Sequence, residues 1–192
     1  MKLIVLNGPA GSGKDVAQNL LPGFKEKFSR PLKAGVQAMF CPDTPIKQLE
    51  KEKEERFPML LGESYRQCQI ELYRHLALHF GPDVLSRLMI NRIEQKRVEI
   101  ERDFGSLVTV SDGGVRAEYY PLLHKYGKEN ILVVQLYREN TYFNDYRRYV
   151  DLSDVGVTTV KVMNNGSIGE LELELRRVIE ANKPEFVKGW LL

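Results

Sequence analysis

The sequence contains little of what secreted, membrane-spanning or nucleic-acid-binding proteins need. It has only two cysteines, a number typical of a protein from a reducing compartment, although a single disulfide is the alternative. The formal net charge is +2, too small to indicate a surface that binds nucleic-acid polymers. No apolar run approaches the roughly 20 residues of a membrane span, and the first residues lack the features of a signal peptide. We therefore expect a cytoplasmic protein that binds neither a membrane nor a nucleic acid.

What is present is an alternation of buried strands and amphipathic helices. With 192 residues, 43% of them apolar, the chain is long enough for a single domain with its own core. Apolar and β-branched runs predict strands at residues 3–6, 24–29, 107–111, 131–137 and 158–162. Helical spacing and terminal signals predict helices at residues 14–21, 31–40, 44–56, 64–80, 84–93, 118–125 and 168–178. This order predicts an α/β fold, with a parallel sheet of about five strands that is flanked by helices.

The glycine-rich segment GPAGSGKD follows the first predicted strand and precedes the first predicted helix. Gly8, Gly13 and Lys14 have the spacing G-x-x-x-x-G-K of a phosphate-binding loop. Glycines allow successive backbone N–H groups to converge on phosphate oxygens, and the lysine reaches the β- and γ-phosphates. A tight strand-to-helix turn with a surface lysine is the alternative. The residues predicted to bind the nucleotide are Gly8, Ala10, Gly11, Ser12, Gly13, Lys14 and Asp15.

Asp15 stands where such loops usually have serine or threonine. The usual hydroxyl binds the magnesium ion that accompanies the nucleotide. A carboxylate is also a hard oxygen ligand, so Asp15 is predicted to contribute to a Mg²⁺ site. The alternative is that its side chain points away and caps the helix.

Two later segments carry further candidate residues. Asp112 ends the apolar run LVTVS, where a second acidic residue is expected near the metal; a turn built with the two following glycines is the alternative. Arg138, Arg147 and Arg148 follow the next predicted strand. Guanidinium groups on such a segment can close over a phosphate and neutralise its charge, so we expect a lid at about residues 138–150. The alternative is that these arginines form a solvent-exposed cluster with no role in binding.

Four stretches, in this order and spacing, resemble one known family: NGPAGSGKD, SRPLKAGVQAMF, ESYRQCQIELYRHLALHFGPDVLSRLMINRI and VSDGGVRAEYYPLLHKYG. The chain is similar to the deoxynucleoside monophosphate kinases of bacteriophages, a branch of the P-loop nucleoside monophosphate kinases that includes the animal phosphomevalonate kinases. The Gly-Lys-Asp ending of the loop is a feature of this branch. The resemblance covers most of residues 1–150 and implies a P-loop kinase fold with a helical acceptor-binding region at about residues 31–101.

The resemblance implies transfer of the γ-phosphate of ATP, with Mg²⁺, to a deoxynucleoside 5′-monophosphate. Lys14, Asp112, Arg138 and Arg147 would be catalytic, and Asp15 and Asp112 would lie near the metal. Lys33, Arg66 and Arg148 would bind the acceptor. The chain has only three histidines, but this reaction requires no general base because the acceptor phosphate is itself the nucleophile. The family often has other residues at the positions of Arg30, Ser64 and Tyr65. These positions lie in the acceptor region, so we expect the differences to affect the base preference more than the reaction.

Two other functions stay open at this point. A related P-loop kinase would use another phosphorylated acceptor, such as phosphomevalonate or a modified nucleotide. A nucleotide-binding regulatory protein would keep Lys14 without needing the lid arginines, so Arg138 and Arg147 argue against it. A homodimer is compatible with the sequence, and a phage origin, implied by the resemblance alone, would place the protein in the host cytoplasm.

Overall fold

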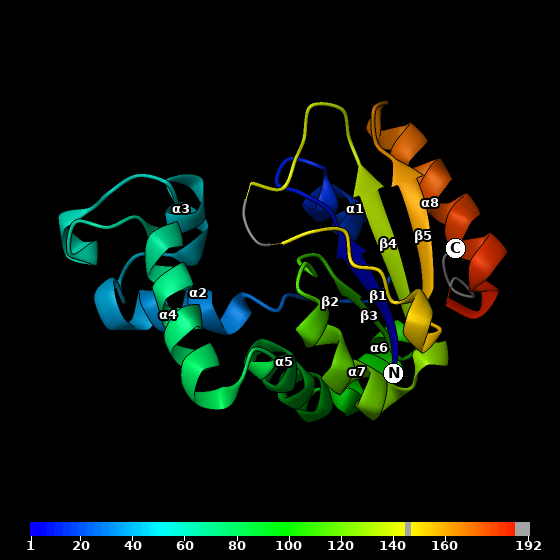
Figure 1. Ribbon diagram of the computed structural model, residues 1–192, viewed down its shortest axis with the longest axis horizontal. Helices are drawn as coiled ribbons and strands as arrows, with labels where there is room; N and C mark the ends of the chain where they lie inside the picture. Colours follow the sequence, from blue (N-terminus) through cyan, green and yellow to red (C-terminus); the bar gives the residue numbers. More distant parts are fainter. Residues whose placement is uncertain (145–146, 187–192) are drawn as a thin grey trace.

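The computed structural model describes residues 1–144 and 147–186, and its centre is a five-stranded parallel sheet (Figure 1). The strand order is β2-β3-β1-β4-β5. The strands are β1 (Lys2–Asn7), β2 (Phe24–Glu26), β3 (Leu107–Val110), β4 (Ile131–Tyr137) and β5 (Thr158–Met163). The predicted α/β class and the five parallel strands are confirmed.

The helices of the described residues follow the predicted order, with two differences. They are α1 (Lys14–Leu20), α2 (Arg30–Phe40), α3 (Ile46–Lys51), α4 (Tyr65–Phe80), α5 (Val84–Gln95), α6 (Arg97–Phe104), α7 (Tyr119–Tyr126) and α8 (Ile168–Asn182). The helix expected at residues 44–56 is shorter, because Leu49 is the only residue of α3 that is buried. Helix α6 was not predicted. None of these helices is long and apolar enough to cross a membrane.

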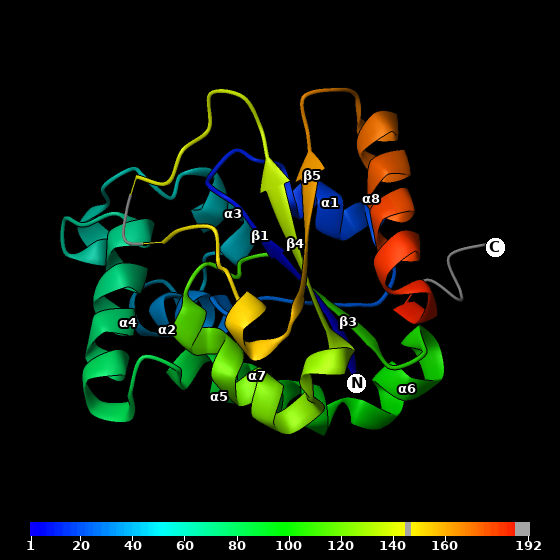
Figure 2. The ribbon, with the colours of Figure 1, turned by 45° about the vertical axis from the view of Figure 1, so that its right-hand side comes forward.

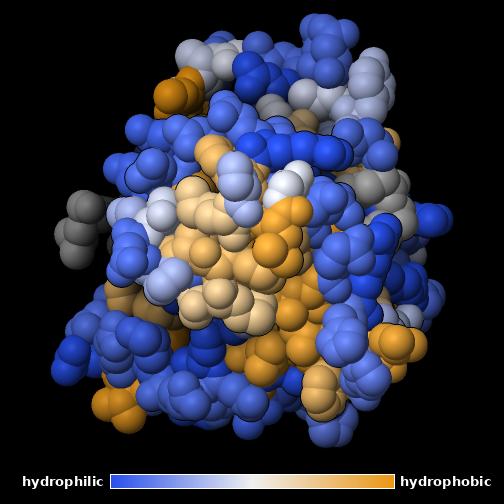
Figure 3. Space-filling model, turned by 90° about the vertical axis from the view of Figure 1, so that its left-hand side faces the viewer, coloured by the Kyte–Doolittle hydropathy of each residue, from blue (hydrophilic) through white to orange (hydrophobic). Residues whose placement is uncertain are grey.

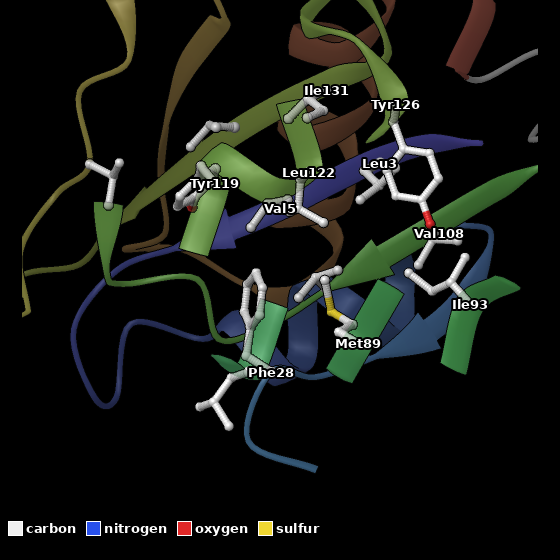
Figure 4. Close-up of a cluster of buried hydrophobic side chains, with 14 of the residues drawn as sticks. Leu3, Val5, Phe28, Met89, Ile93, Val108, Tyr119, Leu122, Tyr126 and Ile131 are labelled. Carbon is white, nitrogen blue, oxygen red and sulfur yellow. The ribbon is translucent and has the colours of Figure 1, made fainter. Parts of the chain in front are cut away.

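The central strand β1 explains why the sheet is covered on both faces. Leu3 and Val5 pack into one apolar cluster with α5, α6 and α7, while Ile4 and Leu6 pack into a second cluster with α1 and α8. All four side chains are completely buried, as alternation along a strand requires when both faces are covered. Figure 4 shows the first cluster, with Phe28 reaching into it from the segment after β2.

Helices α2, α3 and α4 form a separate helical lobe (residues 30–80) at one side of the sheet (Figures 1 and 2). The lobe has a small core of its own, made of Val36, Cys41, Leu49, Leu60 and Tyr65. Figure 3 views the molecule from the side of this lobe and shows apolar side chains gathered on its surface. After the lobe, the chain returns to the sheet through α5 and α6, whose buried residues pack in the first apolar cluster.

Candidate functional site

The glycine loop (residues 8–13) connects the carboxyl end of β1 to α1 and is tightly constrained. A Cβ on Gly8 would lie 2.7 Å from the carbonyl oxygen of Leu136, so a side chain there would clash with β4. Gly11 and Gly13 have φ of 78° and 93°, values that disfavour any residue with a side chain. The buried Asn164 donates its amide N–H to the carbonyl of Ser12 at 2.8 Å. The loop is therefore held in one conformation by its neighbours.

Lys14 folds back over this loop. Its Nζ donates to the carbonyl of Pro9 at 2.5 Å and lies 3.5 Å from Oγ of Ser12. Burial lowers the pKa of Lys14 to about 8, and the positive charge of Arg147 acts in the same direction. An ammonium group that is destabilised in this way gains more than an exposed lysine from an anionic ligand.

An open cleft of about 680 Å³ separates the glycine loop from the helical lobe. The carboxyl ends of parallel strands border it, which is where ligands bind in open α/β sheets. Most of the predicted site residues line the cleft: Ala10, Gly11, Gly13, Lys14, Asp15, Lys33, Arg66, Asp112, Arg138 and Arg147. Gly8 and Ser12 lie buried beneath the loop surface, and Arg148 is exposed outside the lining.

Asp15 does not cap α1, whose N-cap is Gly13. Its Oδ1 accepts hydrogen bonds from Nζ of Lys27 at 2.6 Å and from Oγ of Ser111 at 3.1 Å. Partial burial alone would raise the pKa of Asp15, but Lys27 and Ser111 outweigh it and lower the pKa. Asp15 is therefore an ionised carboxylate that lines the cleft, and its side chain is 74% exposed.

Asp112 fastens the segment after β2 to the end of β3. Its two carboxylate oxygens accept the backbone N–H groups of Phe28 at 2.8 Å and of Ser29 at 2.9 Å. Within residues 1–144 and 147–186, no group of three His, Cys, Asp or Glu side chains could hold a metal ion. Mg²⁺ needs only one or two protein carboxylates when phosphates and waters complete its shell. As hard oxygen donors at the cleft, Asp15 and Asp112 fit such an ion.

The lid segment (residues 138–150) runs from the end of β4 toward the lobe in both ribbon views (Figures 1 and 2). Two of its residues, 145 and 146, lie outside the described residues. Arg138 is exposed and donates from Nη1 to the carbonyl of Gly11 at 3.4 Å. The aliphatic part of Arg147 packs against Gly114, where an added Cβ would lie 3.0 Å from its Cδ. Both arginines thus border the cleft, one near the loop and one near the end of β3.

Two of the three predicted acceptor-binding cations, Lys33 and Arg66, line the cleft on the lobe side, and each is paired with a glutamate. Lys33 Nζ lies 2.8 Å from Oε2 of Glu50, and Arg66 Nε lies 2.6 Å from Oε1 of Glu54. These two cations sit on different helices, α2 and α4, and converge only because the helices pack side by side. An anion that enters this side would compete with the glutamates for them.

Sequence reasoning missed five charged residues that line the cleft: Glu50, Lys53 and Arg74, and also Lys27 and Glu118. Lys27 and Glu118 differ most from what the sequence suggested. The Glu118 side chain is buried, and its Oε2 has no hydrogen-bond partner among the described residues. Burial raises the pKa of Glu118 to about 8, and the negative charge of Asp112 adds to the effect. Neither residue belongs to a recognisable motif, so only the positions of their neighbours could have identified them.

Asn7, at the end of β1, ties the lid segment to the sheet. Its Nδ2 donates to the carbonyls of Gly113 at 2.7 Å and Arg148 at 3.1 Å, and its Oδ1 accepts the N–H of Val150 at 2.8 Å. The side chain is completely buried, and its hydrogen bonds with Gly113 and Val150 are buried as well, so these two groups would lack a partner if it were removed.

Asn7→Ala should lower the free energy of unfolding by about 2–3 kcal/mol, because it leaves one carbonyl and one N–H unsatisfied in the interior. Chemical denaturation measures this directly. Asn130→Ala is the matched control: its amide donates to the carbonyl of Tyr126 at a partly exposed site, so the loss should stay below about 1 kcal/mol. Equal losses in the two variants would contradict the role of Asn7 as the anchor of the lid.

Comparison with known proteins does not identify a family for this chain. No protein-family model matches the chain, and none of the curated proteins matches it. The functional interpretation therefore depends on the motifs and on the geometry of the cleft.

Proposed function

We propose that the protein is a P-loop kinase that transfers the γ-phosphate of ATP to a deoxynucleoside 5′-monophosphate, forming ADP and the diphosphate. One observation carries the proposal: the cleft joins a glycine loop and its lysine to a second set of cations on a separate lobe. A binding protein for a single nucleotide needs only the first set. Two anion-binding walls that face each other suit two phosphorylated substrates.

The donor would bind at the glycine loop. Lys14 would leave the carbonyl of Pro9 for the β- and γ-phosphates, and Arg138 would contact the same phosphates from the lid. The acceptor phosphate would lie toward Lys33 and Arg66, after displacing Glu50 and Glu54 from them. The apolar residues on this side, Leu32, Ile70 and Leu85, would face the rest of the acceptor.

The reaction balances without a general base. An oxygen of the acceptor phosphate attacks the γ-phosphorus, and a new P–O bond forms. The bond from the γ-phosphorus to the bridging oxygen breaks, and its electron pair leaves with ADP. Lys14 and Arg147 stabilise the negative charge on the transferring group. Mg²⁺, when bound, supplies additional charge neutralisation, and the carboxylate of Asp112 is an oxygen donor of the kind that it prefers.

A coupled assay of ADP release tests the proposal. The enzyme is supplied with ATP, Mg²⁺ and each of the four common deoxynucleoside monophosphates in turn, and with phosphomevalonate in a separate reaction. We expect ADP release that depends on at least one deoxynucleotide and is absent in Lys14→Ala. A response to phosphomevalonate alone would replace the proposed acceptor. Binding of ATP without any acceptor-dependent turnover would overturn the kinase assignment.

A further inference from the structure

Lys27 occupies the place where the donor and acceptor parts of the cleft meet. Its ammonium group contacts Asp15 on the first turn of α1, yet its chain position is on the segment that leads into the lobe. Its side chain is 31% exposed, which leaves the ammonium accessible from the cleft. It also lines a smaller cavity of about 280 Å³ beside the cleft, together with Lys25 and Lys33.

The backbone that carries Lys27 is fixed on its carboxyl side. Asp112 accepts the N–H groups of the next two residues, Phe28 and Ser29. The Phe28 side chain is completely buried in the core below the sheet (Figure 4). The segment therefore cannot shift without breaking two charge-assisted hydrogen bonds and exposing an aromatic ring.

It is fixed on its amino side as well. Arg92 donates from Nε and Nη2 to the buried carboxylate of Glu26, and from Nη2 to the carbonyl of Lys27 itself at 2.9 Å. The buried amide of Gln18 donates to the carbonyl of Glu26 at 2.9 Å. These groups hold the main chain at Lys27 in one place. The side chain therefore starts from a fixed point at the edge of the cleft.

The charges around Lys27 converge on the cleft. Lys14 and Arg147 line the same space, and the pKa of Lys14 is lowered by its burial and, to a lesser degree, by the charges of Arg147 and Lys27. Asp15 partly offsets this repulsion. An anion placed between the three cations would relieve it further, which is the arrangement expected around a transferring phosphoryl group.

Given the kinase function proposed above, we infer that Lys27 is a phosphate-binding residue of the transfer site and that Asp15 is its positioning residue. Lys27 donates to the oxygens of the phosphoryl group as it moves from donor to acceptor. Asp15 holds the ammonium at the mouth of the cleft until the phosphates enter. This assigns the unusual loop aspartate to the orientation of a lysine rather than to direct binding of the metal.

Four variants test the inference: Lys27→Met, Asp15→Asn, the double variant, and Lys25→Met as a control. Lys25 is two residues from Lys27 and carries the same charge, but its ammonium donates to the carbonyl of Leu21 and does not line the cleft. We expect kcat to fall by about 10²-fold in Lys27→Met and by about 10-fold in Asp15→Asn. The double variant should be no worse than Lys27→Met, and Lys25→Met should stay within about twofold of wild type.

Binding measurements separate this inference from the proposed reaction. Calorimetric titration with inorganic tripolyphosphate, without metal, should show affinity about tenfold weaker in Lys27→Met and unchanged in Lys25→Met. Unchanged tripolyphosphate binding in Lys27→Met would overturn its role as a phosphate ligand, whether or not the enzyme turns over deoxynucleotides. If the wild-type protein transfers no phosphate but this difference in affinity appears, the proposed kinase reaction is wrong and the role of Lys27 in binding phosphate is supported.

The role of Asp15 has its own readout. ADP binding is titrated against Mg²⁺ in wild type and in Asp15→Asn. We expect the Mg²⁺ concentration for half-maximal binding to change less than twofold. An increase of tenfold or more, with multiplicative kcat losses in the double variant, would overturn the positioning role and make Asp15 a metal ligand.

Discussion

Lys14→Met should abolish phosphoryl transfer and make the protein more stable at neutral pH. The loss of turnover should be at least about 10³-fold, because the lysine is the cation closest to the glycine loop and its contribution is greatest where charge develops. The gain in stability has a separate cause. Burial lowers the pKa of Lys14 from 10.5 to about 8, so at pH 7 the folded protein holds a charge that its surroundings disfavour.

The pH dependence of this gain has a definite sign. A lowered pKa means that the unfolded chain binds more protons than the folded one between pH 8 and 10.5, so wild-type stability from this group rises with pH in that window. The advantage of Lys14→Met should be about 1 kcal/mol at pH 7, after allowing for partial exposure of the side chain, and should vanish above about pH 10.5.

Chemical denaturation at pH 7 and pH 10.5, alongside the ADP-release assay, measures both effects. Lys25→Met is the matched control, because burial also lowers the pKa of Lys25 to about 8. It should share the direction of the stability change and keep its activity. A Lys14→Met protein that is less stable than wild type at pH 7, or one that keeps more than a tenth of the turnover, would contradict the argument.

The strands could be predicted from the sequence because burial on both faces leaves a simple signal. Residues 131–137 are apolar almost throughout, and β4 lies at the same positions between β1 and β5. The helices were predicted less completely. Helix α6 was missed because Ile100 is its only buried residue and ion pairs such as Arg97 with Glu101 line its surface. A helix without an apolar stripe gives no periodicity to recognise.

The candidate site divides in the same way. The glycine loop and its lysine are contiguous in sequence and impose their own spacing, so Gly8, Gly13 and Lys14 were found together. Lys27 was missed because the position of its ammonium group depends on its contact with Asp15. The two residues are 12 apart in the sequence and meet only in the folded chain. Glu118 was missed because burial, not its type or spacing, raises its pKa. Chemistry that arises from contacts between distant segments cannot be predicted from a motif.

Gly13→Ala should remove activity and cost about 3 kcal/mol or more of stability. A Cβ at this position would lie 2.2 Å from Nδ2 of Asn164, well inside contact distance, and φ of 93° adds backbone strain. The amide of Asn164 would have to leave the carbonyl of Ser12, and the loop would lose the bond that shapes it. The unfolding free energy and the rate of ADP release measure the two consequences.

Two companion variants separate the clash from the strain. Gly105 also has positive φ, 57°, but a Cβ there would meet nothing within 4 Å, so Gly105→Ala should cost only about 1 kcal/mol and leave turnover intact. In an Asn164→Ala background the clash is gone, so Gly13→Ala should cost about as little as Gly105→Ala does. If Gly13→Ala still lowers the free energy of unfolding by about 3 kcal/mol in that background, the argument from the clash is wrong. Backbone strain, rather than contact with Asn164 after β5, would then be the reason that the loop requires glycine.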